Sequence, residues 1–113
     1  MDVRLFLLAA LSAFIGSIGQ LEFKRGSATF EFNLYALATN FHLVAGALLY
    51  VFSTVIYVYV LKGGRLSVIY PIIATSYIWT TLFARIFLNE PVNMVTWLGI
   101  ALILLGVTLI TYR

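Results

Sequence analysis

The sequence predicts an all-α integral membrane protein with four transmembrane helices. Of its 113 residues, 63% are hydrophobic and only 10% are charged, and the mean hydropathy is +1.05. Soluble domains carry about 25% charged residues, so this chain has too little polar surface to cover a soluble globule of its size. Its apolar residues also fall into four long runs, which leave no room for a separate soluble domain. We therefore expect residues 1–113 to form a single membrane domain.

Each of the four apolar runs is long enough to cross a bilayer as a helix, which takes about 20 residues. The runs span approximately residues 4–23, 38–61, 66–88 and 92–112. Helices are expected because a backbone in lipid has to satisfy its own hydrogen bonds. The first run resembles a signal peptide, but the rest of the chain is equally apolar, so we interpret it as a retained membrane helix.

The breaks between the runs carry residues that end or start helices. The first break, FKRGSATFEFN, supplies charge, glycine and a candidate helix cap, and the second, LKGGRLS, has two glycines and two cations. In the third, LNEPVN, Pro91 suits a first helical turn because its missing N–H is not needed there. Glu90 beside it is expected to cap the free N–H groups of that turn. Segment 26–37 either extends the second helix or lies along the membrane interface.

Positive charge is distributed almost evenly over the two predicted membrane faces. With four spans, both termini and the turn at 62–65 share one face. The cations of that face are Arg4, Lys62, Arg65 and Arg113, and those of the opposite face are Lys24, Arg25 and Arg85. The small excess predicts that both termini lie in the cytoplasm, and it is small enough to permit insertion in both orientations.

Small and polar residues recur at helical spacing on three of the four runs. At 100° per residue, each set falls on one face of its helix. The sets are Ala10, Ala13, Ser17, Gln20 and Lys24; His42, Gly46, Ser53 and Tyr57; and Tyr70, Ala74, Tyr77, Thr81 and Arg85. Together these faces can wall a polar groove. Alternatively, the small and hydroxylated residues only allow the helices to pack closely.

Two charged residues on these faces, Lys24 and Arg85, are candidates for function. Charged side chains are costly in lipid and are often functional there. For Lys24 and Arg85, both near helix ends, the alternative is that they anchor the helix by snorkelling to the interface.

Proline and glycine positions predict structural roles in the last two runs. Pro71 cannot donate to the carbonyl of Ser67, so the third helix is expected to bend there and to leave that oxygen for a ligand. The alternative is a proline that is simply tolerated near the helix start. Gly99 and Gly106 lie seven residues apart on one face of the fourth run, which predicts a close-packing seam between two subunits of a dimer.

No motif in the sequence indicates catalysis or a cofactor. The chain has no cysteine, no Ser-His-Asp set and no Gly-rich phosphate loop. His42 is the lone histidine and, without nearby acids, a poor metal candidate. The scattered cations do not form a nucleic-acid patch. We expect no enzyme activity, no metal and no nucleic-acid partner, which leaves a transporter, a channel subunit or an accessory subunit.

Three segments resemble members of the drug/metabolite transporter superfamily, in its EamA-like branch. LNEPVNMVTWLGIALILLGVTLI is similar to the closing helix of that superfamily. GQLEFK, with Gln20 and Lys24, and LSVIYPIIATSYIWTTLF, with Tyr70 and Pro71, resemble the small four-helix subunits of the aminoarabinose–phosphoundecaprenol flippase. The resemblance covers residues 17–112.

The resemblance implies a flippase, or a flippase subunit, that moves a sugar linked to polyprenyl phosphate across the bacterial inner membrane. The anionic head would need cations near the membrane surface and hydroxyls or amides for the sugar, which the segment GQLEFKRG can help to supply. The substrate-binding residues that the resemblance implies are Gln20, Lys24, Arg25, Tyr70, Tyr77 and Arg85. The alternative is that this segment only ends and anchors the first helix. Relatives work as pairs, so the resemblance also implies a homodimer or a heterodimer with a second small four-helix subunit.

Two other functions are weighed against the flippase. The related small multidrug resistance exporters carry an acid midway along their first helix, where this chain has Gly16. That departure disfavours proton-driven export of drugs or polyamines. The third interpretation is a non-transporting membrane partner of a lipid-modifying enzyme, which the sequence does not distinguish from the flippase.

Overall fold

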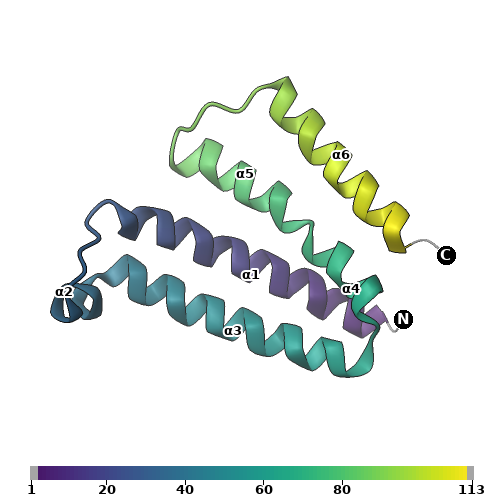
Figure 1. The fold of residues 1–113 in the computed structure, drawn as a ribbon, viewed down its shortest axis with the longest axis horizontal. Helices are drawn as coiled ribbons and strands as arrows, with labels where there is room; N and C mark the ends of the chain where they lie inside the picture. The colour runs from purple at the N-terminus through teal and green to yellow at the C-terminus, as the bar shows by residue number, and fades with distance from the viewer. Residues whose placement is uncertain (1–2, 112–113) are drawn as a thin grey trace.

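The computed structural model describes residues 3–111, and they fold into helices joined by short turns and loops (Figure 1). The helices are α1 (Val3–Ser27), α2 (Leu34–Thr39), α3 (Phe41–Gly63), α4 (Leu66–Ile73), α5 (Ser76–Phe87) and α6 (Met94–Thr111). The all-α prediction is therefore confirmed. The predicted runs lie within one to four residues of these helices, and residue 112, the predicted end of the fourth run, is outside the described residues.

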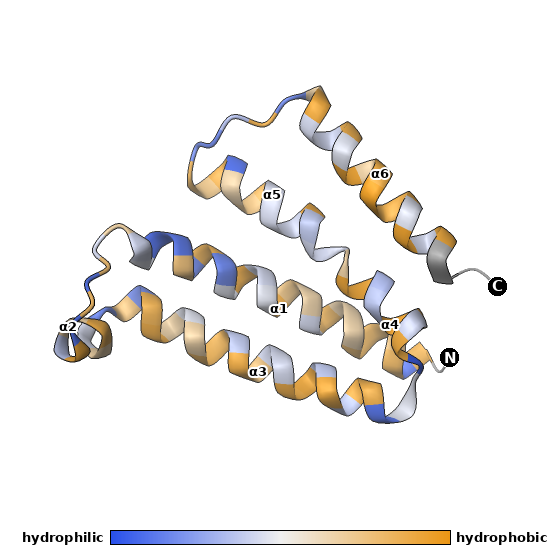
Figure 2. Cartoon of the chain, viewed as in Figure 1, coloured by the Kyte–Doolittle hydropathy of each residue, from blue (hydrophilic) through white to orange (hydrophobic). Residues whose placement is uncertain are grey.

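Three segments are long and apolar enough to cross a membrane, namely Val3–Ser27, Phe41–Gly63 and the α4–α5 segment Leu66–Phe87. The described apolar part of α6, Met94–Leu109, is shorter than these three, so a fourth crossing stays a prediction. Figure 2 shows hydrophilic residues at the C-terminal end of α1 and near the α3–α4 turn, with hydrophobic residues along most of α3 and α6. The chain is a multi-pass membrane protein.

Helices α1 and α3 form an antiparallel hairpin, and α4 and α5 pack on the other side of α1 (Figure 1). A small apolar cluster closes one end of this arrangement, where α1 begins and α3 ends. Its buried members are Ala9, Val60, Ile69 and Ile72. The described residues measure 49 × 36 × 20 Å. Because a helix with its side chains is about 10–12 Å across, the thinnest dimension is about two helices deep and much apolar surface faces outward.

Glycines let the backbones of α1 and α3 approach each other closely. A Cβ atom added at Gly19 would lie 3.2 Å from the carbonyl oxygen of Gly46, and one added at Gly46 would lie 2.9 Å from Phe23. Near the end of α1, a Cβ at Gly26 would lie 2.7 Å from Leu43. On the other side of Gly19, toward the start of α1, Ser12 and Ser53 each donate a hydrogen bond to the other's carbonyl oxygen, over 3.0 and 2.7 Å.

The segment between the first two membrane helices forms the separate short helix α2. The Asn33 side chain caps α2 by accepting from the N–H groups of Tyr35 and Ala36. Asn40 then separates α2 from α3, because its backbone is extended and its side chain accepts from the N–H of Leu43. Segment 26–37 thus does not extend α3, because α1 runs to Ser27 and α2 is a separate helix. The alternative, that this segment lies along the membrane interface, stays a prediction.

The third membrane segment is interrupted one turn after Pro71. Helix α4 contains Pro71 and ends at Ile73, and α5 begins at Ser76. In between, the N–H of Thr75 donates to the Ile72 carbonyl and that of Tyr77 to the Ala74 carbonyl. These hydrogen bonds reach back three residues, as in a 3₁₀-helix, and so wind the chain more tightly than an α-helix does. A bend in this segment was predicted, but it lies at residues 74–75 rather than at Pro71 itself.

The turn between α5 and α6 differs from the prediction. Helix α6 begins at Met94, and its cap is Asn93, whose side-chain oxygen accepts from the N–H of Thr96. The predicted capping by Glu90 is therefore corrected, because that residue lies too far before the first turn. Pro91 likewise lies in the preceding loop and not in the first turn of the helix.

Helix α6 is the outermost helix and packs mainly on α4 (Figure 1). Ile100 is its buried contact residue. The predicted packing glycines of this helix, Gly99 and Gly106, face open space, since a Cβ added at either would meet nothing within 4 Å. Within this chain they are not a packing seam, and the dimer that they were predicted to form stays a prediction.

Candidate functional site

A polar cavity of about 280 Å³ lies among α1, α3, α4 and α5, within the predicted membrane spans. Most of its lining side chains carry a hydroxyl or an amide, and none of them is charged. The lining residues are Ser12, Ala13, Gly16, Ser17, Gln20, Tyr50, Ser53, Thr54, Tyr57, Tyr70, Ile73, Ser76 and Thr80. Such a lining suits a neutral ligand rich in hydroxyl groups, because each hydroxyl can both donate and accept a hydrogen bond.

Part of this lining is used to hold the helices together. Ser12 and Ser53 bond each other across α1 and α3, as described above. The Ser17 hydroxyl donates to the Ala13 carbonyl at 2.9 Å, and it lies 3.3 Å from the Ser76 carbonyl at the start of α5. Ser12 and Ser17 are only 2% and 1% exposed. These buried serines set the spacing of the helices around the cavity.

Other lining groups are available to a ligand. In the part of the chain that the structure describes, the side chains of Gln20, Tyr57, Tyr70 and Thr80 make no hydrogen bond to the protein. They come from α1, α3, α4 and α5, so they surround the cavity rather than line one wall. A ligand in the cavity would therefore meet free donors and acceptors on several sides.

A second cavity of about 260 Å³ adjoins the first and shares Ser17, Gln20 and Thr80 with it. It lies nearer the end of the bundle where α1 and α5 finish. Its full lining is Ser17, Gln20, Leu21, Lys24, Thr80, Phe83, Ala84, Leu88 and Glu90. This cavity adds one cation and one acid, so the two cavities together offer an uncharged inner part and a charged outer part.

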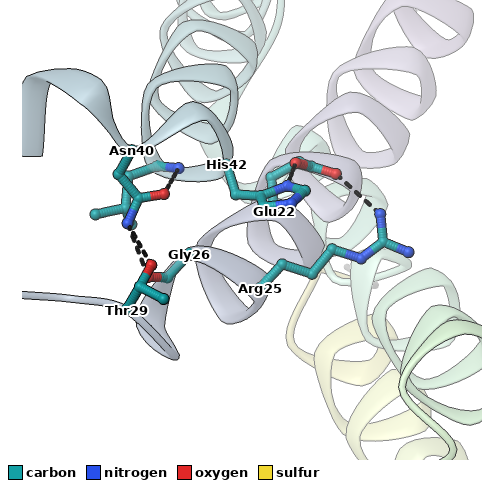
Figure 3. A network of polar contacts seen from close by, with 7 residues as sticks. Glu22, Arg25, Gly26, Thr29, Asn40 and His42 are labelled. Carbon is teal, nitrogen blue, oxygen red and sulfur yellow. Dashed lines mark hydrogen bonds and ion pairs between the residues drawn. The ribbon is translucent and has the colours of Figure 1, made fainter.

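Arg25 and Glu22 belong to a separate network beside the cavities (Figure 3). The Arg25 guanidinium lies 3.3 Å from one Glu22 oxygen, and His42 Nδ1 lies 2.6 Å from the other. The guanidinium carbon is also 5.6 Å from the ring centroid of Phe87 on α5. This network ties the ends of α1, α3 and α5 together. The expectation that His42 has no acid nearby is therefore wrong.

The six candidate substrate-binding residues divide into two groups. Gln20 and Tyr70 line the first cavity, and Gln20 and Lys24 line the second. The other three, Arg25, Tyr77 and Arg85, line neither cavity, and Arg25 is paired with Glu22. The three cations expected to converge do lie at the same end of the bundle, but Lys24 alone among them faces a cavity.

Several lining residues were missed by the sequence analysis although their spacing carries a signal. On α3, Tyr50 and Thr54 lie four residues apart, and Tyr57, which the predicted polar face already includes, follows three residues later. Ser76 and Thr80 lie four apart on α5 in the same way. Each set places its hydroxyls on one helix face. The polar face predicted for this part of the chain followed Tyr77 and Arg85 instead, because the interruption at residues 74–75 was not foreseen.

No metal centre is found in residues 3–111, because no three His, Cys, Asp or Glu side chains come together there as ligands. His42 is instead occupied by its contact with Glu22. The described residues thus form two adjoining cavities lined largely by polar side chains, without a metal centre among residues 3–111.

Comparison with known proteins identifies the class of protein that this fold and site define. Residues 3–112 match the EamA-like transporter family, and the chain belongs to that family. It is a transporter-family membrane protein, not an enzyme.

Individual relatives make the comparison more specific. The chain is 29% identical to a protein of Proteus mirabilis (strain HI4320) named as a probable 4-amino-4-deoxy-L-arabinose-phosphoundecaprenol flippase subunit ArnE, over 96% of this chain and 97% of the relative. It is 34% identical to a probable subunit ArnF of the same flippase from Shewanella sediminis (strain HAW-EB3), over 94% and 86% of the two chains. No solved structure matches significantly. The resemblance found in the sequence is confirmed.

Proposed function

We propose that this protein is a subunit of a flippase that moves a polyprenyl-phosphate-linked sugar across the bacterial inner membrane. The observation that carries the proposal is the uncharged, hydroxyl-lined cavity inside the membrane helices, which adjoins a second cavity with Lys24 at its edge. Relatives named as subunits of such a flippase support the same function.

The two parts of a lipid-linked sugar have opposite requirements, and the chain offers surfaces for both. The polyprenyl tail can stay in the bilayer against the outward-facing apolar side chains of the helices. The sugar head has to leave water, and the free side chains of Gln20, Tyr57, Tyr70 and Thr80 would replace its hydrogen bonds. The phosphate would bind Lys24, because a charge-assisted hydrogen bond contributes about 1.5–3 kcal/mol.

Proton-driven export of cationic drugs is a weaker proposal for this chain. The first cavity, which is lined in part by Gly16, contains no acid among its lining residues. A permanently cationic drug in that inner cavity would have no carboxylate beside it, because Glu90 lines only the second, outer cavity, and burying an unpaired charge is costly.

A second subunit would complete the site. The described residues that line the two cavities come from α1, α3, α4, α5 and the loop after α5, and none comes from α6. The thin shape of the single chain leaves these helices without a cover on their broad faces. We propose a homodimer or a heterodimer with another small subunit, which would also match the names of the relatives as subunits.

The proposed orientation places both termini in the cytoplasm. Helix α1 begins and α6 ends at the same end of the chain (Figure 1), so the Lys24 end would face the periplasm. Reporter fusions at Arg113 are expected to show a cytoplasmic C-terminus. An exclusively periplasmic C-terminus would reverse the proposed orientation without affecting the rest of the proposal.

The direct test is transport in vesicles. The purified protein, alone and with a co-expressed partner subunit, would be reconstituted with 4-amino-4-deoxy-L-arabinose-phosphoundecaprenol, and the exposure of the sugar on each leaflet would be followed in time. The proposal expects faster exchange between leaflets than in protein-free vesicles. Vesicles that exchange no faster with either preparation, while the lipid still binds the protein, would indicate a non-transporting partner.

The role of Lys24 is tested by binding in nanodiscs. Lys24→Gln is expected to weaken binding of the same lipid about tenfold, since 1.4 kcal/mol is one decade in affinity. Lys62→Gln is the matched control, because Lys62 lies at the opposite end of the bundle. Equal binding by both variants and the parent would show that Lys24 is an interfacial anchor.

A further inference from the structure

The second cavity contains two opposite charges that do not neutralise each other. Lys24 reaches it from α1 and Glu90 from the turn between α5 and α6. Within residues 3–111 neither side chain forms an ion pair or a hydrogen bond, although both line the same 260 Å³ space. Opposite charges held apart in one cavity are arranged to receive a ligand that carries both signs.

The position of Glu90 is fixed by the backbone around it. Helix α5 ends at Phe87, and Asn89 in the turn after it has a left-handed φ of 54°, a conformation that asparagine tolerates better than most residues. The N–H groups of Leu88 and Glu90 both donate to the Ala84 carbonyl at 3.1 Å, which turns the chain back over the end of α5. This turn places Glu90 at the cavity.

The Glu90 carboxylate has no structural task in the described part of the chain. Capping of α6 is done by Asn93, so Glu90 is not needed for that helix. The other acids of residues 3–111 are in different positions: Glu22 is bound to Arg25 and His42, and Glu31 lies in the loop before α2. Glu90 is therefore the acid that a ligand in the cavities can reach.

We infer that Glu90 is a specificity-determining residue that selects lipid-linked sugars with a free, protonated amine. Lys24 binds the phosphate and Glu90 binds the ammonium group, so the pair recognises a zwitterionic head. This inference rests on the proposed function and adds which sugars are accepted. A neutral sugar, or one whose amine is acylated, leaves the Glu90 carboxylate without its partner, and sites built around a charged hydrogen bond discriminate against ligands that lack it.

The test compares two lipids that differ only in the charge of the amine. These are 4-amino-4-deoxy-L-arabinose-phosphoundecaprenol and the same lipid with its amine acetylated. Binding to the parent, Glu90→Gln and Glu90→Asp would be measured in nanodiscs, with Glu31→Gln as the control acid outside both cavities. The parent and Glu31→Gln are expected to prefer the free amine about tenfold.

The variants at Glu90 are expected to separate charge recognition from folding. Glu90→Gln should bind the two lipids equally, at the affinity of the parent for the acetylated lipid, and Glu90→Asp should keep part of the preference. Retained binding of the acetylated lipid also shows that the variant is folded. If Glu90→Gln keeps the full preference, or loses both lipids together, the inference is wrong while the proposed function stands. If the parent binds neither lipid, the proposed function fails as well.

Discussion

The α1–α3 hairpin and α6 contain glycines with the same spacing but in opposite environments. Gly19 and Gly26 lie seven residues apart on α1, as Gly99 and Gly106 do on α6. The α1 glycines are buried against α3, where an added Cβ would come within 3.2 Å of another residue, whereas the α6 glycines face open space. The spacing of the glycines alone therefore does not tell which helix packs through its glycine face against another helix of the same chain.

The residues of the facing helix decide whether the glycines of α1 and of α6 are packed or open. On α1, Ser12 and Gly19 are seven residues apart, and on α3 Gly46 and Ser53 have the same spacing. Because the helices are antiparallel, Gly19 meets Gly46 and Ser12 meets Ser53. Helix α6 has no such complementary face within the chain. A seam inside the chain needs small residues in register on both helices.

The largest expected effect is at Gly46, in the middle of this seam. Gly46→Leu should prevent the hairpin from packing, because even a Cβ atom there would lie 2.9 Å from Phe23 and 3.0 Å from the Gly19 carbonyl. Overpacking typically costs about 1–3 kcal/mol and more when the backbone cannot move. Thermal unfolding in detergent should show a large loss of stability. The matched control is Gly99→Leu, for which the stability of the single chain should hardly change.

Removing the helix caps of α3 and α6 should also cost different amounts of stability, and the effects should be smaller than that of Gly46→Leu. Asn40 caps α3 and also ties it to α1, since its Nδ2 donates to the Gly26 carbonyl at 3.0 Å (Figure 3). Asn93 only caps α6. Loss of a cap costs about 1 kcal/mol, and a lost tertiary hydrogen bond adds about as much. Asn40→Ala should therefore lower the unfolding free energy about twice as much as Asn93→Ala. Equal losses would mean that the tie to Gly26 contributes nothing.

The serine pair should have a smaller effect. Ser12 and Ser53 exchange hydrogen bonds across α1 and α3, and their hydroxyl oxygens are 3.2 Å apart. Interhelical hydrogen bonds in membrane proteins contribute about 0.6 kcal/mol on average. A double-mutant cycle with Ser12→Ala and Ser53→Ala should give a coupling energy of about that size. Additive losses would show that each hydroxyl acts alone, and that the glycines hold the seam.

The sequence predicts the fold class and most of the helix bounds, because composition and apolar length are set by the membrane. It also places Gln20, Lys24 and Tyr70 among the candidate residues, since they lie on polar helix faces that the structure brings to the cavities. It does not foresee that Glu22 binds Arg25, or that Asn93 replaces Glu90 as the cap. Those outcomes depend on tertiary contacts and on a turn with one left-handed residue, which no spacing rule reports.

The smallest effect on the single chain, and the most informative about assembly, is expected at Gly106. A Cβ added there meets nothing within 4 Å, so Gly106→Leu is expected to leave the fold and the unfolding temperature of the single chain nearly unchanged. If the open face of α6 is the dimer seam, the same leucine keeps the two helices apart, because close approach of membrane helices requires small residues.

Crosslinking of the protein in native membranes separates these two consequences. The Gly106→Leu variant should show fewer crosslinked dimers and slower movement of the lipid-linked sugar, with monomer stability as in the parent. Leu105→Ala is the control on the same helix, since Leu105 is also exposed but its replacement adds no bulk. If Gly106→Leu crosslinks and transports like the parent, the α6 glycines face lipid. The two subunits would then meet through another surface, such as the uncovered faces of α3 and α5 beside the polar cavities.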